Sequence, residues 1–232
     1  MDRVYPDFRV YTALNKLGVI PLAIFIVAYP ITNEIEHLVR SWGLAPPRLE
    51  RLLPGLGDNA LASFLVYFVL YDFAAYWVHR AQHRFAWWWA LHSLHHSQRR
   101  VTVWSDDRNH VLDDLLVTLV LVVFSQIVGV QPEDYVLILM IGRLIENWSH
   151  ANIDMSFGRL GEKLLVGPRF HRLHHARASA AEPHVHDHNL APCFPSGTSC
   201  SARRSTNGSS GLRASTTRWS TPITAAAGSL SR

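Results

Sequence analysis

Long apolar runs alternate with charged segments along most of this chain. The clearest run extends from Ala60 to Val78, and a second extends from Val111 to Val130, although Asp113 and Asp114 lie near its start. Each run has close to the roughly 20 residues that an α-helix needs to cross the hydrocarbon core of a bilayer. We therefore expect a membrane-spanning helix in each place.

Two weaker runs extend this pattern. Leu17 to Ile31 is short and contains Pro21 and Pro30, and we expect it to form the first membrane helix. Tyr135 to Ile145 follows a turn at residues 129–134 and is expected to fold back on the preceding run as a helical hairpin. The pattern thus predicts an all-α protein, an integral membrane bundle of about four membrane helices.

The segment between the first two runs, residues 32–58, mixes charged residues with proline and glycine. This composition predicts a loop, with an interfacial helix around Glu34 to Trp42 as the other possibility. We therefore expect the first membrane helix to end before this segment.

Basic residues favour one side of the predicted bundle. The turn of the hairpin contains no Lys or Arg, whereas the segments after the second helix and after the hairpin each contain several. By the positive-inside rule, both segments face the cytoplasm of a bacterial inner membrane or of an endoplasmic-reticulum-type membrane. The residues concerned are Arg80, Arg84, Arg99, Arg100 and Arg108 after the helix, and Arg159, Lys163, Arg169, Arg172 and Arg177 after the hairpin.

Residues 191–232 differ in composition from the rest of the chain. They contain sixteen Ser or Thr residues and five arginines, but no acidic residue. Such a segment buries too little apolar surface to offset the entropy of ordering, so we expect a disordered tail after one domain at residues 1–190. The chain's formal charge of +4 comes from this tail, so the near-neutral domain offers no basic groove for nucleic acid. Both cysteines, Cys193 and Cys200, also lie there, which leaves the domain without a thiolate metal site.

Histidine is the residue type that points most clearly to chemistry. Thirteen of the fourteen histidines lie between His79 and His188, and eight of them form the motifs HRAQH at 79–83, HSLHH at 92–96 and HRLHH at 171–175. On a helix, residues at i, i+3 and i+4 share a face, so the imidazoles of one motif can reach the same metal ion or neighbouring ions. Because one ion takes about six ligands at most and chemistry needs open positions, eight imidazoles indicate a two-metal cluster.

The order of these motifs, with the hairpin between the second and the third, resembles the histidine boxes of the fatty acid hydroxylase superfamily. That superfamily comprises membrane di-iron enzymes, including sterol desaturases and lipid hydroxylases. The resemblance extends from about Ala60 to Asn189 and implies two non-haem iron ions in a cytoplasmic cap. It also matches His150 and, less closely, His110 to further histidines of the family. The implied ligands are His79, His83, His92, His95, His96, His150, His171, His174 and His175, with His110 as a tenth candidate.

A few polar residues are candidates for supporting these ligands. Asp72 precedes His79 at helical spacing and is expected either to accept the N–H of a ligating imidazole or to hydrogen-bond Tyr or Trp side chains in the bundle. Glu146 lies four residues before His150 on the same helical face and is a candidate carboxylate ligand. Asp187 and Asn189 match an Asp-x-Asn element that follows the last box in the family. We expect His184, His186 and His188 to be peripheral, and His37 not to bind metal.

The resemblance implies an oxidoreductase that uses O2 and external electrons to hydroxylate or desaturate a membrane lipid. The chain has neither a dinucleotide-binding glycine fingerprint nor a CxxCH haem motif, so a separate reductase, ferredoxin or cytochrome is expected to donate electrons. Sterols, fatty acyl chains, ether lipids and carotenoids all remain open as substrates, as does the oligomeric state. The tryptophans that flank the boxes are expected to form an interfacial aromatic belt or an entrance for the lipid chain. They are Trp87, Trp88, Trp89 and Trp104.

Two alternatives remain beside this reading. A membrane metal-binding or transport protein would place its ligands at mid-membrane depth within broken helices, whereas these histidines lie just beyond helix ends. The other alternative is an inactive remnant of the enzyme, which the composition of the tail suggests.

The tail also departs from the family's pattern. Family members continue with a Trp-Asp-x-Leu-Phe-Gly-Thr segment, whereas this chain reads PSGTSCSA from Pro195 to Ala202. Those residues can be encoded as CCG TCT GGG ACG TCC TGT TCG GCA, which reads Val-Trp-Asp-Val-Leu-Phe-Gly from the third base. We therefore hypothesise a frameshift at or just before Pro195, which would make the tail an out-of-frame translation. The nucleotide sequence decides the matter, because the hypothesis fails if that second frame is missing.

Overall fold

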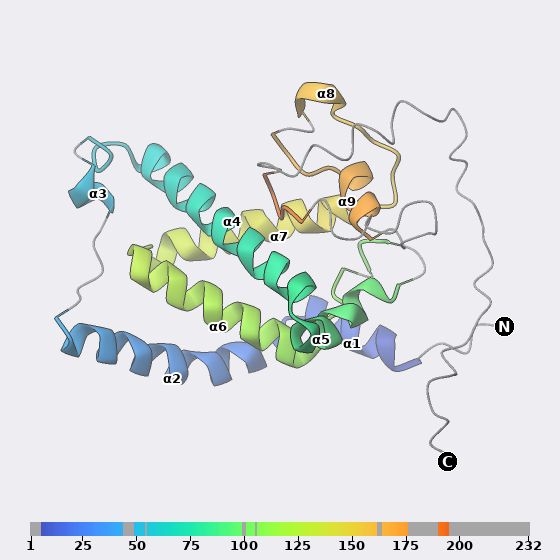
Figure 1. The fold of residues 1–232 in the computed structure, drawn as a ribbon, viewed down its shortest axis with the longest axis horizontal. Coiled ribbons are helices and arrows are strands. Elements are labelled where there is room, and N and C mark those ends of the chain that lie inside the picture. The colour runs from blue at the N-terminus through green and yellow to red at the C-terminus, as the bar shows by residue number, and fades with distance from the viewer. Residues whose placement is uncertain are drawn as a thin grey trace, which may run out of the picture.

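The computed structural model describes residues 6–43, 49–53, 55–98, 101–104, 106–161, 164–175 and 190–194. Within these ranges the regular structure is helical and contains no strand, which confirms the all-α prediction (Figure 1). The helices are α1 Pro6–Lys16, α2 Val19–Ser41, α3 Leu49–Leu52, α4 Ala60–Arg84, α5 Ala86–His96, α6 Val111–Val128, α7 Pro132–Ser149, α8 Gly158–Gly161 and α9 Pro168–His174.

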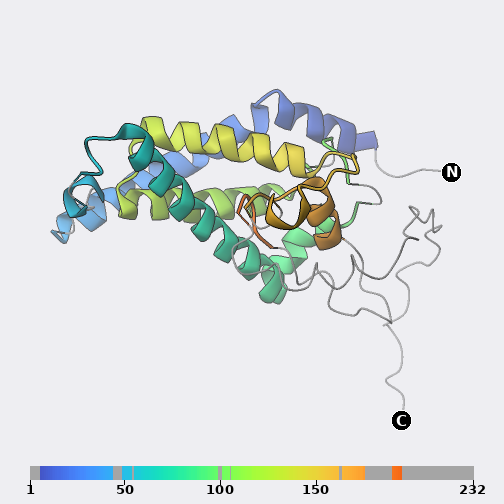
Figure 2. The same ribbon diagram turned by 90° about the horizontal axis from the view of Figure 1, so that it is seen from above.

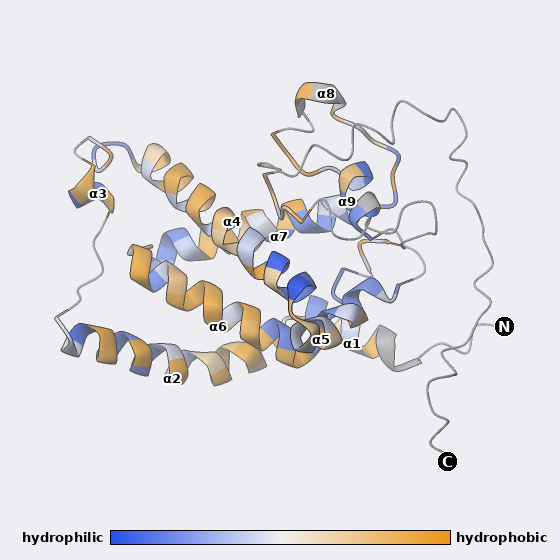
Figure 3. Cartoon of the chain, viewed as in Figure 1, coloured by the Kyte–Doolittle hydropathy of each residue, from blue (hydrophilic) through white to orange (hydrophobic). Residues whose placement is uncertain are grey.

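Three helices of the described chain, α2, α4 and α6, are long and apolar enough to cross a membrane. Their outward surfaces carry exposed large apolar side chains such as Phe25, Leu65 and Val120. Figure 3 shows hydrophobic colouring along all three helices. A water-soluble bundle would bury such surfaces, so they fit contact with lipid. The chain is an integral membrane protein.

The fourth expected membrane helix corresponds to α7. It forms a helix over its whole predicted length, but it also carries Glu133, Asp134, Arg143 and Glu146 and is not among the three apolar helices. The predicted turn between the two helices is present, because α6 ends at Gly129 with a left-handed φ of 84° and α7 begins with Pro132 in its first turn. Gly tolerates that conformation, and Pro fits the first helical turn, where its missing N–H is not needed.

The prediction of a loop from residue 32 onward is wrong for residues 32–41. Helix α2 continues through Pro30 to Ser41, so the expected interfacial helix is its last part. Pro30 removes one backbone hydrogen bond, which a long helix among neighbouring helices tolerates. Beyond it, Arg40 and Glu36 form an ion pair at the i, i+4 spacing that supports a helix, with Nη2 and Oε1 at 2.6 Å.

The helices pack around two apolar clusters. Helix α2 lies along α6, and α4 packs against α5, α6 and α7 (Figures 1 and 2). One cluster joins α4 to α7 through Tyr67 and Ile138, which are both fully buried. The other joins α4, α5 and α6 through Val78, Trp88 and Leu121. This packing fixes the ends of these helices relative to one another.

The histidine motifs gather at one end of this bundle. The chain turns at Phe85, which has an extended backbone, so that α5 folds against the last turns of α4. Helix α9 packs against α7. The short segment of residues 190–194 returns to the same region, where the carbonyl of Cys193 accepts the backbone N–H of Val166 at 2.8 Å.

Candidate metal centre

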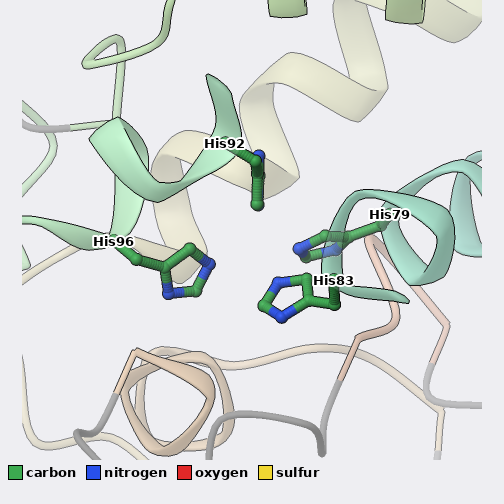
Figure 4. A group of neighbouring side chains, drawn as sticks. All are labelled: His79, His83, His92 and His96. Atoms are coloured by element: carbon green, nitrogen blue, oxygen red, sulfur yellow. The ribbon is translucent and has the colours of Figure 1, made fainter. Parts of the chain in front are cut away.

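The structure brings the nine histidines of the boxes and the hairpin together in two adjoining sets. In the first histidine group, one nitrogen each from His79, His83, His92 and His96 lies within 4.8 Å of the others. Figure 4 shows these four rings facing one another from α4 and α5. In the second histidine group, His95, His150, His171 and His175 meet the same criterion. His174 lies beside the first group, with its Nε2 3.1 Å from Nε2 of His79.

Each HxxHH motif contributes to both groups. His92 and His96 belong to the first group, whereas His95 between them belongs to the second. In the last motif the assignment is reversed. His171 and His175 belong to the second group, and His174 lies beside the first. The i, i+4 pair of each motif thus shares one group while the third histidine reaches the neighbouring one. The repeated spacing therefore lets each motif supply histidines to both groups.

The separations between nitrogen atoms fit coordination of a metal ion. In the second group, Nε2 of His171 lies 3.0 Å from Nε2 of His150 and 3.0 Å from Nε2 of His175. Nε2 of His95 lies 3.4 Å from Nε2 of His150. A metal–nitrogen distance of roughly 2.1 Å separates neighbouring ligand nitrogens by about 3.0 Å in octahedral and about 3.4 Å in tetrahedral geometry. The donor set therefore fits a borderline-soft metal such as iron.

Hydrogen bonds at the far side of two rings direct their lone pairs into the groups. Nδ1 of His79 lies 2.9 Å from the carbonyl oxygen of Leu190, and Nδ1 of His150 lies 2.9 Å from that of Glu146. A carbonyl oxygen only accepts, so both Nδ1 atoms carry the proton and both Nε2 atoms present lone pairs. Among the described residues, Nε2 of His92 is also buried without a hydrogen-bond partner. Such a buried polar atom is costly unless it forms a hydrogen bond or binds a cation.

Burial also selects the protonation state that binds metal. It is the main cause that lowers the pKa of His95, His171, His174 and His175 well below the ordinary value, and repulsion between neighbouring imidazolium forms adds to it. These rings are therefore neutral at physiological pH, as metal ligation requires.

A comparison with known protein families shows which family has these histidine motifs. Residues 64–195, more than half of the chain, match the fatty acid hydroxylase family. The chain belongs to this family. Its members are iron-dependent membrane enzymes that hydroxylate or desaturate lipids with oxygen, and the matched residues include all nine clustered histidines. No solved structure matches the chain.

Two buried carboxylates that the sequence analysis did not single out contact the histidines of this fatty acid hydroxylase domain. Oδ2 of Asp113 lies 3.0 Å from Nδ1 of His92, and Oδ1 of Asp106 lies 3.0 Å from Nδ1 of His150. The apolar run of α6 contained a signal for the first, because a carboxylate inside such a run is costly and usually has a partner. Asp106 lies in the connection between α5 and α6, where the sequence carries no comparable signal.

The expected partner of Asp72 is not an imidazole. Its Oδ1 accepts the backbone N–H of Cys193 at 2.8 Å, and its Oδ2 accepts that of Phe194 at 3.2 Å. These backbone partners differ from both predictions for Asp72, which were an imidazole and a Tyr or Trp side chain. Asp72 instead anchors the segment whose carbonyl at Leu190 accepts the N–H of His79. Asp72 is thus linked to the first histidine group through the backbone of this segment.

The other candidate site residues do not join the two histidine groups in the described part of the chain. The carboxylate of Glu146 pairs with Arg143 at 2.8 Å, while its backbone carbonyl contacts His150, so the side chain lies outside the two groups. His110 also lies outside them and caps α6, because its Nδ1 accepts the backbone N–H of Leu112 at 3.2 Å. The remaining candidates lie outside the described residues, namely Asp187, Asn189, His184, His186 and His188.

Proposed function

We propose that this protein is a membrane di-iron oxygenase that hydroxylates or desaturates a C–H bond of a lipid of the sterol or fatty acyl type. It would use O2 as co-substrate and take electrons from a separate reductase, ferredoxin or cytochrome. The observation that carries the proposal is the pair of adjoining imidazole groups built from shared motifs at the end of membrane helices. The two ions would lie side by side because each HxxHH motif contributes to both groups.

The chain's own residues would hold two irons. The first would be bound by His79, His83, His92, His96 and His174, and the second by His95, His150, His171 and His175. When bound, the irons supply the reduction of O2 to an oxidant strong enough to remove hydrogen from an unactivated C–H bond. The protein's task is to keep the ligands neutral and aligned, and to exclude water from the site.

Tryptophans beside the first group have separate roles in this proposal. The ring of Trp89 lies 5.0 Å from that of His83 and 5.3 Å from that of His96, between centroids, so it covers the imidazoles with an apolar surface. Trp87 and Trp104 are exposed and would lie at the interface with lipid. Trp88 is buried against α4 and α6 and contributes to neither the entrance nor the belt.

The orientation of the site in the membrane is also part of the proposal. Arg80 and Arg84 lie in the last turns of α4, and Arg169 and Arg172 lie in α9. By the positive-inside rule, these arginines favour a cytoplasmic location for the histidine end. A soluble electron donor would then approach from the cytoplasm.

The first test is metal content. The full chain, purified in detergent micelles, is expected to contain about two irons, and His171→Ala is expected to contain fewer. His110→Ala is the matched control, because His110 lies outside both groups. A chain that binds no iron, or variants that lose iron equally, would contradict the proposal.

The second test is the lipid product. Lipids of a host that expresses the chain are compared with those of the same host expressing His171→Ala, by mass spectrometry. A gain of one oxygen atom or a loss of two hydrogens identifies both the substrate and the reaction. Iron binding without a lipid product would favour a metal-binding protein or an inactive remnant. Because the family match ends at residue 195, where we expect the reading frame to change, a frame-corrected version is assayed in parallel. Product from that version alone would identify a remnant.

A further inference from the structure

Asp113 connects three helices beside the first histidine group. It lies in the first turn of α6 and is 2% exposed. Its Oδ1 accepts hydrogen bonds from Nε2 of Gln82 in α4 at 2.7 Å and from Nε1 of Trp88 in α5 at 2.8 Å. Its Oδ2 lies 3.0 Å from Nδ1 of His92 in α5. Each oxygen of the carboxylate therefore has a nitrogen atom within hydrogen-bond distance.

These contacts determine where the proton of His92 lies. The indole nitrogen of Trp88 and the amide nitrogen of Gln82 only donate, so Oδ1 acts as an acceptor for both. An ionised carboxylate only accepts hydrogen bonds, so Oδ2 is an acceptor too and the proton lies on Nδ1 of His92. The lone pair of His92 is then on Nε2, which is buried and has no hydrogen-bond partner within the described part of the chain.

We propose that Asp113 is a positioning residue that fixes the tautomer and the ring orientation of His92, and thereby sets the metal affinity of the first histidine group. The inference rests on the proposed function, because it requires His92 to be a metal ligand. A carboxylate behind a ligating imidazole also makes the ring a stronger donor. Among the other rings, Nδ1 of His79 donates to a backbone carbonyl, and Nδ1 of His150 lies near both a backbone carbonyl and Oδ1 of Asp106. At His92 the described partner of Nδ1 is the side chain of Asp113, so substitution of that side chain tests this control.

The neighbouring residue provides a matched control. Asp114 also lies in the first turn of α6, but its Oδ2 accepts a hydrogen bond from the hydroxyl of Tyr11 in α1 at 3.3 Å and contacts no histidine of the first group. Asp113→Asn and Asp114→Asn each replace one carboxylate at the same helix end with an amide. A general effect of charge or of helix capping would appear in both variants.

The primary experiment titrates Co²⁺ into the metal-free full chain in detergent micelles and follows the visible absorption of the bound ion. In Asp113→Asn, the amide oxygen can keep the bonds to Gln82 and Trp88, which directs the NH2 group at Nδ1 of His92. That ring must then move its proton to Nε2, which removes a metal ligand. We expect the dissociation constant of the first group to rise roughly 10- to 100-fold, as is typical for loss of such a partner. Asp114→Asn is expected to titrate like the unsubstituted chain.

A double-mutant cycle separates positioning from a structural role. In a His92→Ala background the imidazole is absent, so Asp113→Asn is expected to have no further effect on Co²⁺ affinity. An equal loss of affinity in both backgrounds would overturn the proposal, because Asp113 would then act on the fold and not on His92. Unchanged affinity in Asp113→Asn would overturn it as well. If the unsubstituted chain binds no Co²⁺, the proposed function fails instead.

A measurement without substitution at Asp113 covers the case in which Asp113→Asn does not fold. Nitrogen-15 spectra of the metal-free chain, labelled at histidine, are compared with those of His92→Ala. The signals missing from the variant belong to His92, and we expect them to show a protonated Nδ1 and an unprotonated Nε2. A proton on Nε2 would overturn the proposal whatever the behaviour of the variants.

Discussion

Replacing Asp72 with alanine tests whether the segment of residues 190–194 is held by a buried carboxylate. In the structure, the two oxygens of Asp72 accept the backbone N–H groups of Cys193 and Phe194 at 2.8 and 3.2 Å. A hydrogen bond to a charged group contributes roughly 1.5–3 kcal/mol, so the two bonds together contribute roughly 3–6 kcal/mol. Because the second bond is long, we use the lower value, about 3 kcal/mol, which corresponds to a more than 100-fold change in the local opening equilibrium.

The thiol of Cys193 reports this opening directly, because it is only 5% exposed. Cys200→Ser leaves it as the single thiol, and its rate of alkylation is measured under conditions where the segment closes faster than the reagent reacts. Burial raises the pKa of this thiol in the closed state, so labelling takes place in the open state, where the intrinsic reactivity is the same in both chains. We expect Asp72→Ala to accelerate labelling about 100-fold or more, and Asp114→Asn to leave it unchanged. Less than about threefold acceleration would refute the reasoning.

Three further predictions concern the histidines. His96→Ala and His95→Ala each remove one proposed ligand from a different group. We expect the number of bound Co²⁺ ions to fall from about two towards about one in each variant. Loss of both ions from either variant would contradict separate groups. The metal-free chain is expected to melt at lower temperature as pH falls below about 6.5, because burial lowers the folded-state pKa of His95 and other clustered histidines, and the unfolded chain then binds more protons. A melting temperature that stays constant between pH 7.5 and 5 would refute this prediction. His110→Ala removes the cap of α6 and is expected to cost roughly 0.5–2 kcal/mol in unfolding free energy, with metal content unchanged.

Local sequence patterns predicted the parts of the fold that depend on neighbours in the chain. The apolar runs of α4 and α6, the hairpin turn at Gly129 and the shared faces of the histidine motifs all follow from helical periodicity and turn residues. The first membrane helix was predicted to end too early because the charged residues after Ile31 were assigned to a loop. These residues continue the helix, and Glu36 and Arg40 among them form an ion pair at helical spacing.

The hydrogen-bond partners of the histidines could not be predicted in the same way, because they depend on tertiary contacts. The partner of His92 is 21 residues away in the sequence, and the partner of His79 is 111 residues away. Leu190 contributes only a backbone carbonyl, for which no side-chain pattern exists. Asp72 was expected to have a partner, either an imidazole or a Tyr or Trp side chain, but the identity of that partner depends on where the returning segment lies.

The positions of these contacts predict that metal binding and catalysis depend on different parts of the chain. The nine clustered histidines, Asp113, Asp72 and the segment of residues 190–194 all precede residue 195, where we expect the reading frame to change. With a change of frame at Pro195, the carbonyl that orients His79 and the backbone groups that bind Asp72 belong to the in-frame part of the chain. An out-of-frame tail would leave the ligands and their partners intact, so the metal affinity of the chain should equal that of a frame-corrected version. A lower affinity in this chain would mean that residues beyond 194 contribute to the metal centre itself. Equal affinity combined with a lipid product only from the corrected version would assign those residues to substrate binding or electron transfer.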